Sequence, residues 1–171
     1  MSKIYTRAGD SGKTKTLCGV EVLKDNCLIE VNGRIDDLQV SIDRIMAQLP
    51  VSSGDFDNLK RVQLLLWQLG GEISGQKIGD LVKHPIRQCD VDSLENWIDA
   101  IPPKVTSFQR FRTIIAIDTN EVRVRTRELE RVLVQYMEEY KLRKVVYAYI
   151  NRLSDYFFAL SVRLEQDWQR V

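Results

Sequence analysis

Apolar residues recur at intervals of three and four along most of the chain, the spacing that places them on one face of a helix. Three such stretches lie in the first two thirds of the sequence, at about residues 30–49, 59–73 and 91–101. Glycine or proline follows each of them within a few residues, and both residue types end helices. We therefore expect a helix in each stretch.

The last third of the chain predicts two more helices. Asp118, Thr119 and Asn120 are residues that commonly cap the start of a helix, so we expect a fourth helix to begin there and to continue over 122–140. A fifth follows from the same apolar spacing over 146–164. No strand with alternating polarity appears at useful length. The fold predicted is all-α, an up-and-down bundle of about five helices.

The N-terminal part of the chain differs from the rest. All nine glycines lie at or before Gly79, and Gly9, Gly12 and Gly19 are the first three. We expect an extended, tightly turning segment over residues 1–28 and the bundle over 29–171. The 171 residues, 44% of them hydrophobic, suffice for a single domain with an ordinary core.

Charge and composition exclude several classes of function. The 25 lysines and arginines nearly balance 24 aspartates and glutamates, so we expect neither nucleic acid nor a membrane surface as partner. Three cysteines without metal-ligand spacing indicate reduced thiols in a cytoplasmic protein. His84 is the only histidine, which removes most histidine-dependent catalytic schemes. We expect no metal site built from side chains.

A row of arginines offers the first candidate chemistry. Arg123, Arg127 and Arg131 are four residues apart and share one face of the predicted helix. Like charges at this spacing repel, so the row indicates an anion, most simply a phosphate group. The alternative is a solvated helix face on which the arginines pair with glutamates that lie nearby in the sequence, Glu121, Glu128 and Glu130.

A second polar group lies in the last predicted helix. Asn151, Asp155 and Phe158 share a face beside the apolar stripe, and Glu130 adds an acid next to the arginine row. Polar groups beside a core are either paired with other protein groups or directed at a ligand. The ordinary role for Glu130 is to pair with a neighbouring arginine.

Residues Gly12, Lys13 and Thr14 imitate the end of a phosphate-binding P-loop. The motif requires a glycine where this chain has Arg7, and a buried strand before it, which the short polar N-terminus does not supply. We therefore exclude a P-loop. A polar, glycine-rich segment can still approach phosphate through its backbone N–H groups.

Several segments together resemble one family. Residues 5–14 read Tyr-Thr-Arg-Ala-Gly-Asp-Ser-Gly-Lys-Thr, then come Lys24-Asp25, and residues 33–38 read Gly-Arg-Ile-Asp-Asp-Leu. In the other half, the arginine row with Glu130 is followed by Tyr-Ile-Asn-Arg-Leu-Ser-Asp-Tyr at residues 149–156. In residue type and spacing, these segments resemble the PduO-type ATP:cob(I)alamin adenosyltransferases, also called corrinoid adenosyltransferases.

The resemblance implies a ferritin-like bundle that forms a homotrimer, with ATP between the N-terminal segment of one subunit and the arginine helix of the next. It implies transfer of the 5′-deoxyadenosyl group of ATP to cob(I)alamin, which gives adenosylcobalamin and triphosphate. Mg²⁺ would accompany ATP, and cobalamin would be a substrate. The implied partners are a flavoprotein reductase and a cobalamin-dependent acceptor enzyme.

The resemblance also implies roles for individual residues. Arg123 and Arg127 would hold the triphosphate, and Asp36 would orient an arginine, Arg131, across the interface. Phe108 and Phe158 would form walls of the corrin pocket. The residues implied in ATP binding are Tyr5, Thr6, Gly9, Asp10, Gly12, Lys13, Thr14, Lys24, Arg123, Arg127, Glu130 and Asn151.

One departure from the family pattern leaves a second function open. Residues 108–113 contain neither proline nor glycine, whereas the family carries a Phe-x-Leu-Pro-Gly-Gly turn there. The alternative is a non-catalytic homologue that binds ATP or adenosylcobalamin as a delivery or regulatory module. A third hypothesis is a purely structural helical oligomer.

Overall fold

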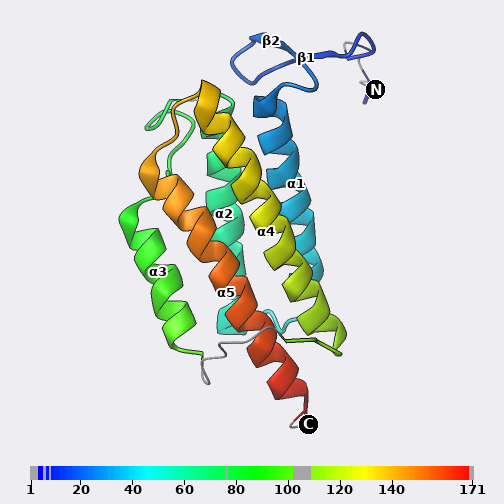
Figure 1. The fold of residues 1–171 in the computed structure, drawn as a ribbon, viewed down its shortest axis with the longest axis vertical. Helices are drawn as coiled ribbons and strands as arrows, with labels where there is room; N and C mark the ends of the chain where they lie inside the picture. Colours follow the sequence, from blue (N-terminus) through cyan, green and yellow to red (C-terminus); the bar gives the residue numbers. More distant parts are fainter. Residues whose placement is uncertain (1–3, 6, 8, 76, 102–108, 170–171) are drawn as a thin grey trace.

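The computed structural model describes residues 4–169, except residues 6, 8, 76 and 102–108. Its helices are α1 (Cys27–Met46), α2 (Gly54–Ile73), α3 (Gln88–Asp99), α4 (Ile114–Glu139) and α5 (Lys144–Gln169). Successive helices run in opposite directions along the long axis of the molecule (Figure 1). The up-and-down bundle of five helices is confirmed.

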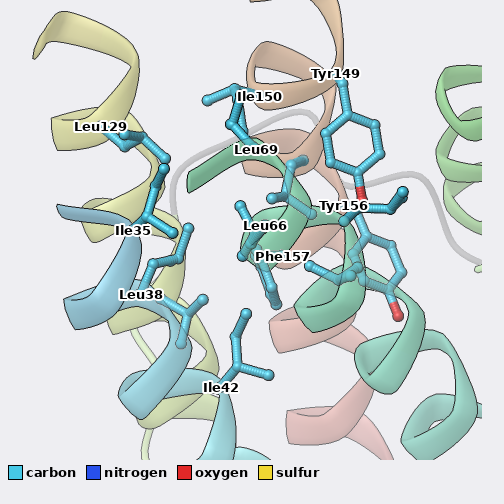
Figure 2. Close-up of a cluster of buried hydrophobic side chains, with 14 of the residues drawn as sticks. Ile35, Leu38, Ile42, Leu66, Leu69, Leu129, Tyr149, Ile150, Tyr156 and Phe157 are labelled. Atoms are coloured by element: carbon cyan, nitrogen blue, oxygen red, sulfur yellow. The ribbon is translucent and has the colours of Figure 1, made fainter. Parts of the chain in front are cut away.

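Helix α4 packs between α1 and α5, while α2 covers α1 and α3 covers α5. The apolar stripes expected from the sequence face one another and form one core, in which Leu38 of α1, Leu66 of α2 and Phe157 of α5 are completely buried (Figure 2). This packing determines which faces of α4 and α5 are outside the core and can carry functional side chains.

The N-terminal segment contains two strands of three residues, β1 (Lys13–Lys15) and β2 (Glu21–Leu23), which pair antiparallel. They are too short for alternating polarity to reveal them in the sequence. Gly19 has a φ of 81°, which the turn between the strands requires and which glycine adopts without strain. The strands contact each other and no helix in the described part of the chain, and they lie beyond the N-terminal end of α1 (Figure 1).

The prediction for the start of α4 was wrong. The helix begins at Ile114, one turn before the residues expected to cap it. The Asp118 carboxylate is buried and accepts a hydrogen bond from Gln48, in the turn after α1, at 2.7 Å. The Thr119 hydroxyl donates to the carbonyl of Ile115, one turn earlier, at 2.7 Å. Thr119 therefore bonds within its own helix, and Asp118 joins α4 to the end of α1, where Arg44 also pairs with it at 2.9 Å.

A buried carboxylate from the other end of the sequence explains the earlier start. Glu165 of α5 accepts hydrogen bonds from the backbone N–H groups of Arg112 (3.1 Å) and Thr113 (3.0 Å), and from the Thr113 hydroxyl (2.8 Å). Thr113 is the N-cap residue of α4. A negative charge beside the first N–H groups of a helix is stabilising. This contact joins residues far apart in sequence, so local capping rules could not reveal it.

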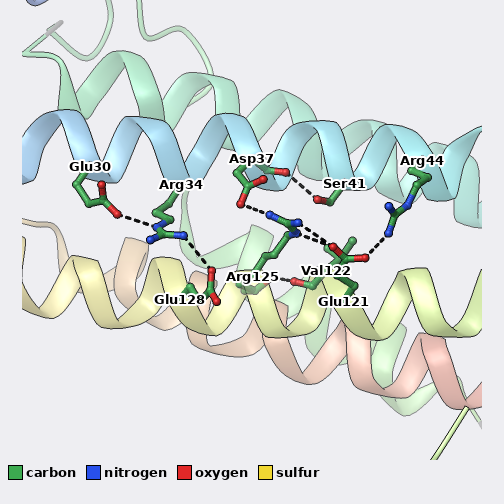
Figure 3. Close-up of polar contacts among 10 residues, drawn as sticks. Glu30, Arg34, Asp37, Ser41, Arg44, Glu121, Val122, Arg125 and Glu128 are labelled. Atoms are coloured by element: carbon green, nitrogen blue, oxygen red, sulfur yellow. Dashed lines mark hydrogen bonds and ion pairs between the residues drawn. The ribbon is translucent and has the colours of Figure 1, made fainter. Parts of the chain in front are cut away.

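A charged seam joins α1 to α4 along the bundle (Figure 3). At its centre, Arg125 of α4 forms ion pairs with Asp37 of α1 and with Glu121 on its own helix. Glu121 also pairs with Arg44 of α1. The hydrogen bonds from Arg125 and Arg44 lower the pKa of the Glu121 carboxyl group, although burial opposes this effect.

A second part of the seam lies nearer the N-terminal end of α1. Arg34 pairs with Glu30 on its own helix at 2.8 Å and with Glu128 of α4 at 3.1 Å. Together the two parts of the seam set the position of α4 along α1. The seam thereby fixes the position of α1, which carries Asp36, relative to α4, which carries the arginine row. Asp36 itself points away from the seam.

We predict that Glu165→Leu lowers the free energy of unfolding by about 1–3 kcal/mol, because the two N–H groups before α4 lose their acceptor. Glu165→Gln keeps one carbonyl oxygen and should cost less. Asp167→Ala, an exposed acid on the same helix, is the control and should stay within about 0.5 kcal/mol of the parent. Urea unfolding at one protein concentration measures all three; equal effects of Glu165→Leu and Asp167→Ala would contradict the assigned role.

Candidate functional site

The N-terminal turn brings together several residues expected to bind ATP. The Lys24 N–H donates to the Gly12 carbonyl at 2.9 Å, and the Gly12 N–H donates to the Gly9 carbonyl at 3.2 Å. A Cβ atom on Gly9 would lie only 2.9 Å from the Lys24 ammonium nitrogen. Gly12 has a φ of 79°. Glycine adopts this positive φ without strain, and the end of the Lys24 side chain packs against the backbone at Gly9.

The remaining residues of this segment lie on the surface around the turn. Lys13 begins β1 and pairs with Glu21 at 2.8 Å, while Thr14 faces Val22 in the two-stranded sheet. The glycine before Lys13 thus leads into a strand, which agrees with the exclusion of a P-loop. Asp10 is exposed.

Tyr5 is exposed, and the Arg7 guanidinium lies 5.6 Å from the centre of its ring. An arginine within about 6 Å of an aromatic ring forms a cation–π contact. Thr6 lies outside the described residues.

The arginines of α4 differ in how their charge is neutralised. Arg125 has two carboxylate partners, as described above. Arg123 donates from Nε to the neutral side-chain oxygen of Asn120 at 2.8 Å. Arg127 has only a distant contact with Glu130, at 3.9 Å, and Arg131 is exposed without a hydrogen bond or ion pair to any described residue. The positive charges of the three arginines in the predicted row are thus little neutralised by described carboxylates.

Burial, together with the charge of Arg127, lowers the pKa of the Arg123 guanidinium. A cation that is partly desolvated and repelled by its neighbour is stabilised when an anion binds between them. Of the three glutamates named in the alternative interpretation, Glu121 and Glu128 pair with other arginines in the seam with α1, and Glu130 keeps a contact with Arg127 at 3.9 Å.

Glu130 and Asn151 meet between α4 and α5. The Asn151 amide donates to the Glu130 carboxylate at 2.8 Å, and the Tyr147 hydroxyl donates to the same oxygen at 3.4 Å. Burial and the charge of Glu130 raise the pKa of the Tyr147 hydroxyl. Glu130 therefore joins two helices, and its pairing with Arg127 is secondary. The contact brings together two of the residues expected to bind ATP.

Other residues on α5 are less closely associated with this pair. Asp155 forms an ion pair with Arg152 at 3.0 Å, which in turn reaches Glu95 of α3. Phe158 is partly buried on α5. Phe108, the other expected corrin contact, lies outside the described residues.

Asp36 lies on the exposed side of α1 and contributes to a cavity of about 160 Å³. Leu17, Gln39 and Trp67 also line this cavity, and the Trp67 side chain is 66% exposed. Asp36 forms no hydrogen bond or ion pair with any described residue of its own chain. The expected contact with Arg131 is thus absent within one described chain.

Sequence reasoning missed two features of this site. Asn120 was interpreted as a helix cap, although its position three residues before Arg123 is the spacing of a side-chain contact on a helix. Arg125 was not singled out, because its partner Asp37 lies on another helix. Both had a signal in the sequence, because Glu121 precedes Arg125 by four residues, the spacing of an ion pair on a helix. Only the contact with Asp37 required the structure.

The described residues contain no group of three or more histidine, cysteine, aspartate or glutamate side chains that could hold a metal ion. None of the helices in this part of the chain is long and apolar enough to cross a membrane.

Comparisons with known proteins identify the family of this chain. The model of the cobalamin adenosyltransferase family matches residues 4–164. The chain is 30% identical over 177 residues to a corrinoid adenosyltransferase of Citrobacter freundii, with 97% of this chain and 96% of the relative covered. It is 32% identical over 164 residues to one of Bacillus subtilis, with 92% and 83% covered.

Solved structures give the same result. The chain is similar, with a TM-score of 0.82 and 26% identity, to a variant PduO-type ATP:corrinoid adenosyltransferase from Lactobacillus reuteri complexed with cobalamin and ATP. The likeness covers 98% of this chain and 93% of that one. With the family model matching almost the whole length, this chain belongs to the cobalamin adenosyltransferase family.

Proposed function

We propose that this protein transfers the 5′-deoxyadenosyl group of ATP to cob(I)alamin, giving adenosylcobalamin and triphosphate. The observation that carries the proposal is the row of arginines on α4, which lacks close carboxylate partners among the described residues although carboxylates neutralise Arg125 on the same helix. A triphosphate supplies the missing negative charge. The family to which the chain belongs supports the reaction.

In the proposed reaction the electron pair of cobalt(I) attacks C5′ of ATP. A cobalt–carbon bond forms, the C5′–O bond breaks, and triphosphate leaves with the electrons of that bond. No proton needs to be removed, which fits a site without a histidine or a paired general base. Arg123, Arg127 and Lys24 would stabilise the charge that grows on the departing triphosphate.

The N-terminal turn and the α4–α5 pair have complementary roles in this proposal. Backbone N–H groups around Gly9 and Gly12 would close over the phosphates, with Tyr5, Thr6, Asp10, Lys13 and Thr14 beside them. Glu130 and Asn151 would hold the nucleoside end or fix the arginine helix. Mg²⁺ would enter on the triphosphate, since the described residues offer no ligand cluster of their own.

For the corrin ring we propose an apolar pocket with Phe158 and Phe108 among its walls. Excluding water there would favour four-coordinate cobalt, which is easier to reduce. A flavoprotein reductase and a cobalamin-dependent acceptor enzyme would then be the partners, in the cytoplasm. Residues 112 and 113 are held by Glu165, so this chain anchors the segment after the corrin-facing residues without the glycines usual in the family.

We propose that the active form is a homotrimer with each site between two subunits. Two features support this arrangement: the N-terminal strands contact no described helix of their own chain, and Asp36 has no partner among its described residues. In a trimer the N-terminal turn of one subunit would face the arginine row of the next, and Asp36 would pair with the neighbour's Arg131.

The activity is tested by mixing the protein anaerobically with chemically reduced cob(I)alamin, Mg²⁺ and ATP and recording the visible spectrum. We predict that the cob(I)alamin bands disappear and that a light-sensitive product with the spectrum of adenosylcobalamin forms. Omitting the protein is the control. Tight ATP binding without conversion would instead support the non-catalytic delivery or regulatory homologue.

We predict that Arg127→Ala weakens ATP binding about tenfold or more, because a charge-assisted contact with phosphate is lost. Arg125→Gln is the matched control: it also removes a positive charge from α4, but one that carboxylates already neutralise. It should lower stability by about 1 kcal/mol and change the dissociation constant of ATP by about twofold or less. Calorimetry measures ATP binding by both variants. An equal loss of ATP affinity in both would show that only the overall charge of α4 matters for binding.

We predict that two inactive variants restore activity when mixed. Lys24→Ala and Arg127→Ala should each have little activity, because each removes a charge from every site. If the N-terminal turn and the arginine row belong to different subunits, mixed oligomers contain some sites with both residues intact. Activity should therefore rise after the variants are unfolded and refolded together, and not when each is treated alone. No recovery, with mixed oligomers shown by mass spectrometry, would place both residues in one subunit.

A further inference from the structure

Asn120 holds the arginine nearest to it by an uncharged contact. Its side-chain oxygen accepts a hydrogen bond from Nε of Arg123 at 2.8 Å, one turn further along α4. The other two guanidinium nitrogens of Arg123 make no hydrogen bond with described residues. One edge of the guanidinium group is thus fixed, and its terminal N–H groups remain available.

The chemistry of this contact differs from that of the neighbouring Arg125. Carboxylates of Asp37 and Glu121 hold Arg125, and they cancel its charge while they orient it. An amide oxygen restricts the side chain without cancelling its charge. A guanidinium group that keeps both its charge and its terminal N–H groups can form two parallel hydrogen bonds with one phosphate.

The environment of Arg123 makes such orientation useful. The side chain is partly buried and lies close enough to Arg127 for the two charges to repel. An unrestrained arginine would lower this repulsion by turning towards water, away from Arg127. The hydrogen bond that Arg123 donates to Asn120 opposes that movement, so both arginines can meet the same anion at a smaller loss of side-chain freedom.

We propose that Asn120 is a positioning residue that holds Arg123 ready for the triphosphate of ATP, and that it must be uncharged to do so. This inference rests on the proposed function, because it takes Arg123 as a ligand of the triphosphate. Asn120 itself need not touch ATP. The group recognised is a chain of phosphates, and the contribution of Asn120 grows with the charge of that chain.

The decisive comparison is between Asn120→Ala and Asn120→Asp. Alanine removes the restraint and should weaken ATP binding about threefold, as expected for one lost hydrogen bond. Aspartate has the same size as asparagine and keeps an acceptor at the same place, but it adds a negative charge beside the phosphates. It should weaken ATP binding about tenfold or more. Asn120→Gln keeps an uncharged amide and should lie between the parent and alanine.

Stability should follow the opposite order. Aspartate three residues before an arginine forms a favourable ion pair on a helix, so Asn120→Asp should unfold at the same temperature as the parent or a higher one. Asn120→Ala should stay close to the parent, since the position is only partly buried. A purely structural hydrogen bond would move stability and binding in the same direction, which is why the aspartate variant separates the two roles.

The experiment measures binding of ATP, ADP and AMP to the full-length oligomer by calorimetry, the KM for ATP in the cob(I)alamin assay, and the unfolding temperature. For Asn120→Asp we expect a loss of affinity that is largest for ATP and smallest for AMP, a raised KM, and unchanged or increased stability. The inference is overturned if Asn120→Asp binds ATP as tightly as the parent, or if it loses the same affinity for all three nucleotides.

Arg123→Ala in the same series distinguishes this inference from the proposed function. If Arg123→Ala loses ATP binding while the Asn120 variants all bind as the parent does, Arg123 contacts the triphosphate and Asn120 has no positioning role. If Arg123→Ala also binds ATP like the parent while Arg127→Ala does not, Arg123 is not a ligand of the triphosphate and the role of Asn120 is wrong. If both arginine variants bind ATP like the parent, the row is not the triphosphate site, and the proposed function of the row is wrong as well.

Discussion

Repulsion among the arginines of α4 is the constraint on which the site depends. Four of them lie between residues 123 and 131, and at this density each charge needs either a partner or water. Asp37 and Glu121 hold Arg125 within the protein. The others have an amide, a distant carboxylate and solvent beside them. The charge that remains attracts a polyanion.

This division of charge depends on how the bundle packs. Helix α4 lies between α1 and α5, so one side of it pairs with charged residues of α1, Asp37 among them, and the other contacts Asn151 and Tyr147. Glu130 is the only acid of α4 whose described contacts are on the α5 side, and it is engaged mainly by Asn151. Few of the protein's own carboxylates therefore compete with phosphate for the arginines. This preserves the affinity of the arginines for phosphate at a cost in protein stability.

The bundle itself could largely be predicted from the sequence. Ile35, Leu38 and Ile42 were expected to share the core face of the first helix, and all three are buried. Periodicity succeeds here because every helix must bury one stripe of apolar side chains. The predicted start of α4 was wrong by about one turn, because the two backbone N–H groups just before the helix donate to Glu165, more than fifty residues later. The strands escaped detection because three residues are too few to show alternation.

The sequence by itself determined the helical bundle, the glycine-rich N-terminal turn and the arginine row, because apolar spacing, glycine and like charges on one helix are local properties. It also indicated the family, through residues whose order along the chain is enough to reveal the resemblance. Only the tertiary structure decided which charges remain available. Arg125, Glu130 and Asp118 each have a partner on another helix. Electrostatic neutralisation depends on distance in space, which the spacing of residues along one helix does not give.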